Sequence, residues 1–265
     1  MPVSVRAACL REIHPEIEVI EVDYNNLADD DTLGWAEYTL QVLGYVPEAV
    51  FTSEDYGEAY AKAMGSTHIM VDRARAVIPC SGTMIRDNPL DCLDYLSPPM
   101  RAFYVKRVCI LGAESTGTTT LAKALAEYYN TVWVPEYGRE YCEVKWKDGY
   151  IDHWTTDEFV HIAQEQSKRE DAAARIANKI LICDTDPFAT SIWHLRYMGE
   201  RSPEVEEIAQ VRHYDLYILT GDEIAFDQDG YRDGEHIRHW MHKVFIRELD
   251  ASGRLWVLAA GTHEE

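Results

Sequence analysis

The sequence predicts an α/β protein in which a doubly wound parallel sheet carries a phosphate-binding loop. Through the second part of the chain, short apolar stretches of strand length alternate with longer helical patterns, which is typical of βαβ units. The apolar stretch Lys106–Leu111 runs directly into Gly112–Thr119, which is rich in glycine and threonine, and a helical pattern follows. A strand, a loop and a helix in this order are the context that a phosphate-binding loop requires.

The elements expected after this loop continue the alternation. The further predicted strands are Val132–Val134, Ile180–Cys183, Leu216–Leu219 and Leu255–Leu258. Predicted helices run from the loop to Asn130, from the Thr155–Glu158 capping-box pattern to about Ala177, near Phe188–Met198, and over Glu235–Leu249. Strands that alternate with helices in this way favour a parallel sheet covered on both faces.

The first part of the chain shows a shorter α/β pattern. It predicts helices at Val3–Ile13, Leu33–Leu43 and Glu54–Met64, strands at Ile17–Val22, Ala49–Thr52 and His68–Val71, and a turn at Ser81–Arg86. Ser97–Met100 contains two consecutive prolines and is the best break between the parts. We therefore expect one domain over residues 1–100 and a second over residues 101–265.

Composition and charge limit the classes of function. The formal net charge of −21 repels the backbone of nucleic acids, and no basic patch offsets it, so DNA or RNA binding is not expected. The apolar runs are shorter than the roughly 20 residues of a membrane helix, and the first residues do not look like a signal segment. Six cysteines without a CxxC pair indicate reduced thiols and a cytoplasmic protein.

The loop after the first strand supplies donors for phosphate oxygens. Backbone N–H groups and the start of the following helix favour bound anions, and ATP needs only such local donors together with Mg²⁺. The residues expected to bind the ATP phosphates are Gly112, Ser115, Thr116, Gly117, Thr118, Thr119 and Thr120. Thr119 stands where the loop hydroxyl coordinates Mg²⁺, whereas Thr118 replaces the usual lysine and removes a charge from the β/γ-phosphates. The alternative is a turn that binds no ligand.

Acidic residues follow two of the predicted strands. Asp184 ends an apolar strand at the carboxyl edge of the sheet, where ligands of α/β proteins bind. It is a candidate Mg²⁺ ligand or the base that takes a hydroxyl proton, and Asp186 could share that work. Glu136 could hold ribose hydroxyls or act as the base. The alternative for each is a carboxylate that caps the next helix, and this alternative is strongest for Asp186.

Four motifs in order resemble the ribosylnicotinamide kinase domain of the bifunctional NadR-type proteins. These motifs are Gly112–Leu121, Glu136–Glu140, Asp184–Asp186 and Asp227–Arg232, and the resemblance covers about residues 105–260. It implies that the γ-phosphoryl group of ATP is transferred, with Mg²⁺, to the 5′-hydroxyl of nicotinamide riboside. Phosphoryl transfer of this kind needs positioning and charge neutralisation more than covalent chemistry.

The same resemblance implies roles for several side chains. Arg232 and Arg238 match a lid over the transferring phosphoryl group, and Arg232 is the catalytic candidate of the two. Either arginine, or Arg139 in the substrate site, could partly replace the missing lysine. Tyr197 matches one of the aromatic residues that grip the nicotinamide ring, whereas the expected tryptophan is absent and Trp133 lies two residues out of register. An aromatic residue on an amphipathic helix can equally belong to the core.

The first part of the chain resembles the second half of the adenylyltransferase domain of these proteins. Thr52–Gly57 and Val71–Arg75 match its pattern, and Ser81, Thr83 and Arg86 match its second ATP motif. The His-x-Gly-His-type motif of the first half has no counterpart in the sequence. A phosphate-binding-loop kinase is therefore expected after a partial Rossmann-like nucleotidyltransferase domain, in which Ser81–Arg86 is either functional or a vestigial turn.

The function expected from these observations is phosphorylation of nicotinamide riboside in NAD biosynthesis or salvage. The partners are then small molecules, ATP and the riboside, and an open strand edge in the first part makes a homo-oligomer possible. Two alternatives remain. One is a non-catalytic nucleotide-binding regulator of NAD metabolism, and the other is a kinase for another nucleoside.

Overall fold

The computed structural model describes residues 1–22, 27–147, 153–230 and 232–261. It forms two compact units that divide between Tyr95 and Leu96. The predicted break at Ser97–Met100 is instead the start of helix α5 (Pro98–Tyr104). Backbone N–H groups at the first positions of a helix have no partner within the helix, so proline, which lacks an N–H group, is tolerated there. The two prolines therefore begin this helix.

The second unit is built on a five-stranded parallel sheet with the order β4-β5-β3-β6-β7. Its strands are β3 (Lys106–Leu111), β4 (Trp133–Val134), β5 (Ile180–Asp184), β6 (Leu216–Thr220) and β7 (Trp256–Ala259). Each strand predicted for this part of the chain is present, with small shifts at the ends. From the central strand β3 the chain first crosses to β4 on one side and later to β6 and β7 on the other. The predicted doubly wound α/β fold is therefore confirmed.

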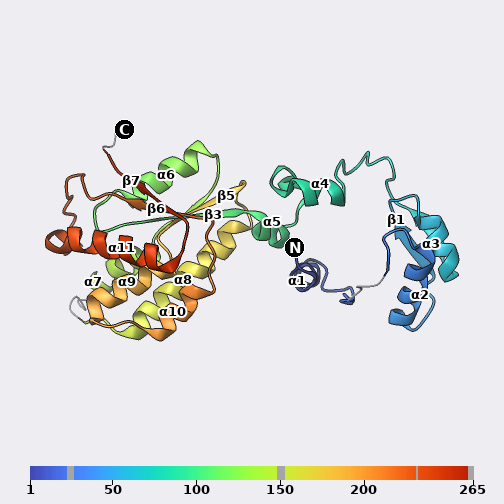
Figure 1. The fold of residues 1–265 in the computed structure, drawn as a ribbon, viewed down its shortest axis with the longest axis horizontal. Helices are drawn as coiled ribbons and strands as arrows, with labels where there is room; N and C mark the ends of the chain where they lie inside the picture. Colours follow the sequence, from blue (N-terminus) through green and yellow to red (C-terminus); the bar gives the residue numbers. More distant parts are fainter. Residues whose placement is uncertain (23–26, 148–152, 231, 262–265) are drawn as a thin grey trace. The chain divides into compact units, whose positions relative to one another are not determined.

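Helices cover both faces of this sheet (Figure 1). Helix α6 (Thr118–Tyr128) lies on one face, and most of the other helices lie on the opposite face. These are α7 (Tyr137–Lys147), α8 (Thr156–Ala174), α9 (Pro187–Met198), α10 (Pro203–Gln210) and α11 (Arg238–Ser252). The sequence patterns did not predict α7 or α10. No helix in the described ranges combines the length and the apolar character that crossing a membrane requires.

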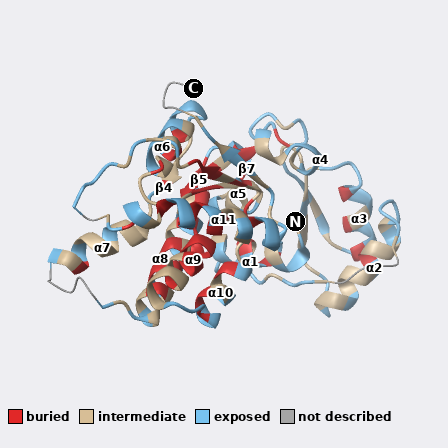
Figure 2. Ribbon diagram, turned by 60° about the vertical axis from the view of Figure 1, so that its left-hand side comes forward, coloured by how far each residue is buried: buried red, intermediate tan, exposed pale blue. Residues whose placement is uncertain are grey.

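The core of the second unit lies against the central strands. Cys109–Leu111 and Leu181–Asp184 are buried (Figure 2). Ile110 and Ile182 pack against Ala122 and Ala126 of α6, whose small side chains let the helix lie close to the sheet. The carboxyl ends of β3 and β5 are therefore held rigidly, and the loops that follow them start from fixed positions.

The first unit is smaller and has a two-stranded parallel sheet. Strands β1 (Ala49–Thr52) and β2 (Thr67–Met70) pair in parallel, and α3 (Gly57–Met64) connects them. The remaining elements are α1 (Val3–Ile13), α2 (Thr32–Leu43), α4 (Gly82–Asp87) and the short 3₁₀ turns Pro89–Asp91 and Leu93–Tyr95. The helices and the last two strands predicted here are confirmed with shifted ends.

Two predictions for the first unit were wrong. Ile17–Val22 forms no strand; the Val19 carbonyl accepts a hydrogen bond from the Arg11 side chain instead of a neighbouring strand. Ser81–Arg86 is not a plain turn, because α4 occupies most of it. The Ser81 hydroxyl accepts the Met84 N–H at 3.1 Å and caps this helix.

We expect backbone amides in β1 and β2 to exchange hydrogen faster than those in β3 and β5. A two-stranded sheet is marginal by itself, and Phe51 of β1 remains 65% exposed. Hydrogen exchange followed by mass spectrometry measures this difference, with sedimentation at several protein concentrations as the control for self-association. Slow exchange in β1 and β2 of a monomeric protein would contradict the expectation.

Candidate active site

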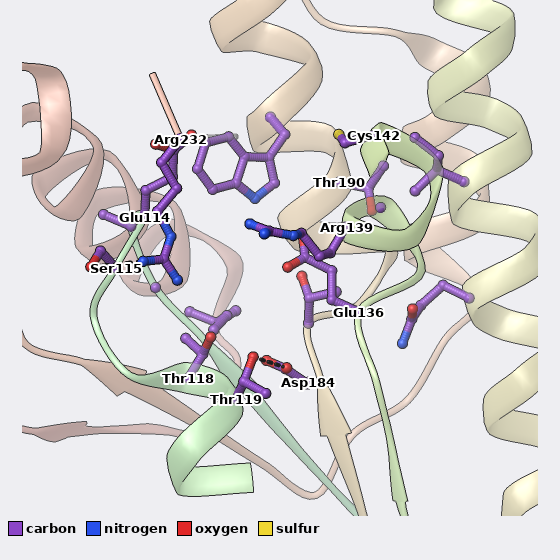
Figure 3. A pocket seen from close by; sticks show the side chains of 18 of the residues that line it. Glu114, Ser115, Thr118, Thr119, Glu136, Arg139, Cys142, Asp184, Thr190 and Arg232 are labelled. Carbon is purple, nitrogen blue, oxygen red and sulfur yellow. Dashed lines mark hydrogen bonds between the residues drawn. The ribbon is translucent and has the colours of Figure 1, made fainter. Parts of the chain in front are cut away.

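A cavity of about 380 Å³ opens at the carboxyl ends of β3, β4 and β5 (Figure 3). One wall is the loop between β3 and α6, and the opposite wall comes from α7, α8 and α9. Residues of the loop after β6 also line it, among them Asp229 and Arg232. Ligand sites of doubly wound folds lie at this edge, so the cavity is the candidate active site.

The loop after β3 has the backbone of a phosphate cradle. A Cβ atom at Gly112 would lie 2.1 Å from the Thr220 hydroxyl, so only glycine fits there. The Thr116 hydroxyl donates to the Ala113 carbonyl at 2.7 Å and is 2.6 Å from the Thr220 hydroxyl. Gly117 has a φ of 84° and lets the chain turn into α6. The first residues of this helix, Thr118 and Thr119, line the cavity, so the N-terminus of α6 lies at the cavity.

Only some of the predicted phosphate-binding residues line the cavity. Gly112, Ser115, Thr118 and Thr119 do so. The buried Thr116 and the turning residue Gly117 shape the loop instead, and Thr120 is exposed on α6. The threonine in place of the usual lysine, Thr118, therefore lies in the cavity wall.

Thr119 and Asp184 form a pair at the base of the cavity (Figure 3). The Thr119 hydroxyl donates to Asp184 Oδ2 at 2.6 Å. Burial raises the pKa of Asp184, and hydroxyl groups of Thr119 and Thr118 oppose that shift. The described residues contain no cluster of three or more acidic, cysteine or histidine side chains suited to a metal. A hydroxyl and a carboxylate nevertheless fit Mg²⁺, which takes most of its ligands from phosphates and water.

Glu136 follows β4 and faces the same cavity. Its carboxyl group can be reached from the cavity but is otherwise surrounded by protein, and this burial, with repulsion from Asp184, raises its pKa to about 8. Arg139 opposes the shift. The next residue is held in place, because the Tyr137 N–H donates to Gln166 Oε1 at 2.9 Å. The backbone next to Glu136 is thus held in place, and the pKa of about 8 makes its carboxyl group a candidate general base.

Asp186 has the structural role that was its alternative. Its Oδ1 accepts the Ala189 N–H at 2.9 Å and caps α9, and its Oδ2 accepts the Tyr217 hydroxyl at 2.8 Å. The side chain is buried and does not line the cavity. The structure thus shows Asp186 as a helix cap and does not place it where it could share the work of Asp184 or contact a substrate in the cavity.

The arginines of the predicted lid differ in position. Arg232 lines the cavity, and its Nη1 lies 3.4 Å from the Ser115 hydroxyl. Arg238 lies outside the cavity lining and donates to the Ser115 carbonyl at 3.1 Å, so it supports the loop from behind. Arg139 lines the cavity from α7. Tyr231, within the matching motif, lies outside the described residues.

Aromatic side chains from α7, α8 and α9 and from the segment before α8 also line the cavity. Tyr197 is among them, 5.2 Å from the ring of Trp154. The other aromatic residues that line the cavity are Trp146, Phe159 and Trp193. Trp133 is not one of them; it packs against the core beside α6. Trp154 and Phe159 flank the start of α8 as a hydrophobic staple, a sequence signal that could have found them.

In the first unit, the matched ATP-motif residues bond to one another. Ser81 caps α4, and Arg86 donates to the Thr83 hydroxyl at 3.1 Å. These are contacts within the segment itself. They are the contacts expected of a vestigial turn, and they leave the binding of a nucleotide by this segment untested.

A family model described as "AAA domain" matches residues 107–265. The chain belongs to the AAA domain family. The matched region begins in β3 and includes the phosphate loop, every cavity wall and the lid arginines. The predicted fold class is confirmed by this match and by the parallel sheet.

The chain is homologous to NadR. Two proteins named "Trifunctional NAD biosynthesis/regulator protein NadR", from Escherichia coli (strain K12) and Salmonella typhimurium (strain LT2), are each 32% identical to it over 197 residues. Each match covers 71% of this chain and 46% of the relative, so the chain spans about half the length of these relatives.

Solved structures share the fold. A NadR protein in complex with NR matches with a TM-score of 0.76 and 24% identity, covering 97% of this chain and 76% of that one. A NadR protein in complex with NAD and AMP-PNP matches with a TM-score of 0.73 and 22% identity, covering 100% of this chain and 79% of that one. The resemblance predicted from the motifs is thereby confirmed.

We expect Glu136→Gln to stabilise the protein at alkaline pH. Because the pKa is raised from 4.5 to about 8, the folded protein keeps a proton that the unfolded chain releases, and the free energy of unfolding falls as the pH rises between these values. The variant should gain on the order of 2 kcal/mol over the parent at pH 9 and little at pH 4, since cavity water screens part of the penalty. Urea unfolding at both pH values measures the gain, and an equal effect at both would contradict it.

Proposed function

We propose that this protein transfers the γ-phosphoryl group of ATP to the 5′-hydroxyl of nicotinamide riboside, giving nicotinamide mononucleotide for NAD biosynthesis or salvage. The observation that carries the proposal is a single cavity whose lining combines two chemically different groups of residues. One group is the phosphate loop with the Thr119–Asp184 pair, and the other is the set of aromatic side chains that includes Tyr197. The homology to NadR supports the choice of substrate.

The residues of the phosphate loop would hold Mg·ATP. N–H groups of the loop and of the first turn of α6 would donate to the phosphate oxygens, and Thr119 and Asp184 would hold Mg²⁺. Bound Mg²⁺ supplies charge neutralisation at the phosphoryl group. Arg232, next to Ser115, is the cation beside this loop and takes the catalytic role predicted for it.

The aromatic residues would hold the riboside by contact with its nicotinamide ring. Tyr197 and Trp154 each already carry a protein cation over the ring, Arg196 at 4.3 Å and Lys145 at 4.1 Å from the ring centres. Arg139 and Glu136 line the same cavity. Glu136, whose pKa is raised to about 8, would accept the proton of the hydroxyl group in its ionised form.

One observation favours a different function. Thr118 lacks the positive charge of the lysine that usually stands at this position. A loop without that charge suits a protein that binds a nucleotide without turning it over. This regulatory alternative and the kinase differ in whether ADP forms when riboside is added. A kinase for another nucleoside is the further alternative, and competition by uridine or a deoxynucleoside distinguishes it.

The parent protein with Mg·ATP should convert nicotinamide riboside to the mononucleotide, and Asp184→Asn should lower kcat on the order of 100-fold. The substitution keeps the shape of the side chain and removes the charge that holds the metal. Chromatographic detection of the mononucleotide measures the rate. Glu127→Gln, an exposed change further along α6, is the matched control and should retain activity. A parent protein that forms no product at millimolar ATP would favour the regulatory alternative.

Thr118→Lys should tighten Mg·ATP binding about tenfold, because it supplies a charged donor to the β/γ-phosphates. Calorimetric titration measures the affinity. Arg232→Ala tested in both backgrounds shows whether this arginine serves in place of the lysine: its loss should weaken binding more in the parent than in the lysine variant. Weaker binding by Thr118→Lys alone would mean that another cation already occupies the space.

A further inference from the structure

Asp229 places a carboxylate between the two arginines of the cavity. Its Oδ2 lies 2.7 Å from Arg139 Nη2 and 3.5 Å from Arg232 Nε, and all three residues line the cavity. The arginines come from opposite walls, Arg139 from α7 and Arg232 from the loop after β6 (Figure 3). One anion thus bridges two cations that belong to different elements.

Other carboxylates also contact these arginines, but from outside the cavity. Glu143 lies 2.8 Å from Arg139 Nε, and Asp227 lies 3.4 Å from Arg232 Nη1. Their side chains are 41% and 84% exposed, and neither lines the cavity. The Asp229 side chain is 26% exposed. Of the three carboxylates named here as contacts of the arginines, it is the one that lines the cavity.

The segment that carries Asp229 is docked on the phosphate loop. The Asp227 N–H donates to the Ser115 hydroxyl at 2.8 Å, and the Gly234 N–H donates to Glu114 Oε2 at 2.7 Å. Arg196 links the phosphate loop to this segment, because it contacts Glu114 at 3.2 Å and Asp233 at 2.5 Å. The arginine pair is therefore assembled by contacts of the protein alone, and on the cavity side Asp229 is the carboxylate that contacts both guanidinium groups.

We propose that Asp229 is an internal counter-anion that competes with the phosphates of the nucleotide for Arg139 and Arg232, a role that rests on the proposed ATP site. Two guanidinium groups converging on one anion form the arrangement that recognises a phosphoryl group. A polyphosphate with Mg²⁺ carries more charge than one carboxylate and makes further contacts with the loop, so it displaces Asp229 from the pair. Weak monovalent anions lack those contacts and leave Asp229 in place. Asp229 thus sets the selectivity of the arginine pair for polyphosphate.

The test measures binding of inorganic tripolyphosphate with Mg²⁺ to the full chain by calorimetric titration. Asp229→Asn removes the charge of the side chain and nearly keeps its shape. Asp229→Ser is measured as well, so that the test can still be made if one of the two variants does not fold. Asp227→Asn is the matched control, because it removes a charge from the same segment and the same Arg232 but on the exposed side. Thermal unfolding checks that each variant is folded.

Loss of the competitor should tighten tripolyphosphate binding about threefold or more in both Asp229 variants and leave the Asp227 variant within about twofold of the parent. Asp229→Glu, which restores the charge, should return the affinity toward that of the parent. If the parent binds tripolyphosphate but the Asp229 variants bind it equally well or more weakly, Asp229 does not compete with phosphate. Its contacts then only position the arginines, and the counter-anion role is wrong although the phosphate site is supported. If no variant binds tripolyphosphate, the proposed ATP site itself is wrong, and the inference falls with it.

Discussion

The hydrogen bond between Thr119 and Asp184 joins the two elements on which the candidate site depends. Thr119 is in the first turn of α6 and Asp184 is the last residue of β5, so this 2.6 Å contact ties the phosphate loop to the neighbouring strand. The core beneath this hydrogen bond holds α6 against the sheet, because Ile110 and Ile182 pack against the alanines of α6. The apolar packing of the sheet therefore determines where the polar groups at its edge meet.

The charges in the cavity balance over short distances even though the whole chain is strongly acidic. Burial and the nearby Asp184 raise the pKa of Glu136 to about 8, because both disfavour a second negative charge at this point of the cavity. Arg139 and Arg232 are paired with Asp229. A formal charge of −21 thus does not exclude an anionic ligand, since the groups that would meet it are arranged locally.

The sequence predicted the regular sheet of the second unit well, because strands buried on both faces leave a strong apolar signal. It could not separate the roles of Asp184 and Asp186. The residue between them, Thr185, has a φ of 72°, and the chain changes direction there. Asp184 consequently stays at the cavity while Asp186 turns inward to cap α9 and bond to Tyr217. A local backbone conformation of this kind is not visible in residue types.

The aromatic side chains of the cavity were missed for a related reason. Trp146 reaches the cavity from α7, whose sequence mixes aromatic and charged residues without a clear apolar stripe, so neither the helix nor its inward face could be predicted. The capping box and the staple mark Trp154 and Phe159 at the start of α8, but their place in the cavity lining depends on how α8 packs against its neighbours. Individual side chains at the strand ends were predictable because the sheet fixes them. Those that converge from separate helices depend on tertiary packing, and the same packing brings polar and aromatic side chains to one cavity.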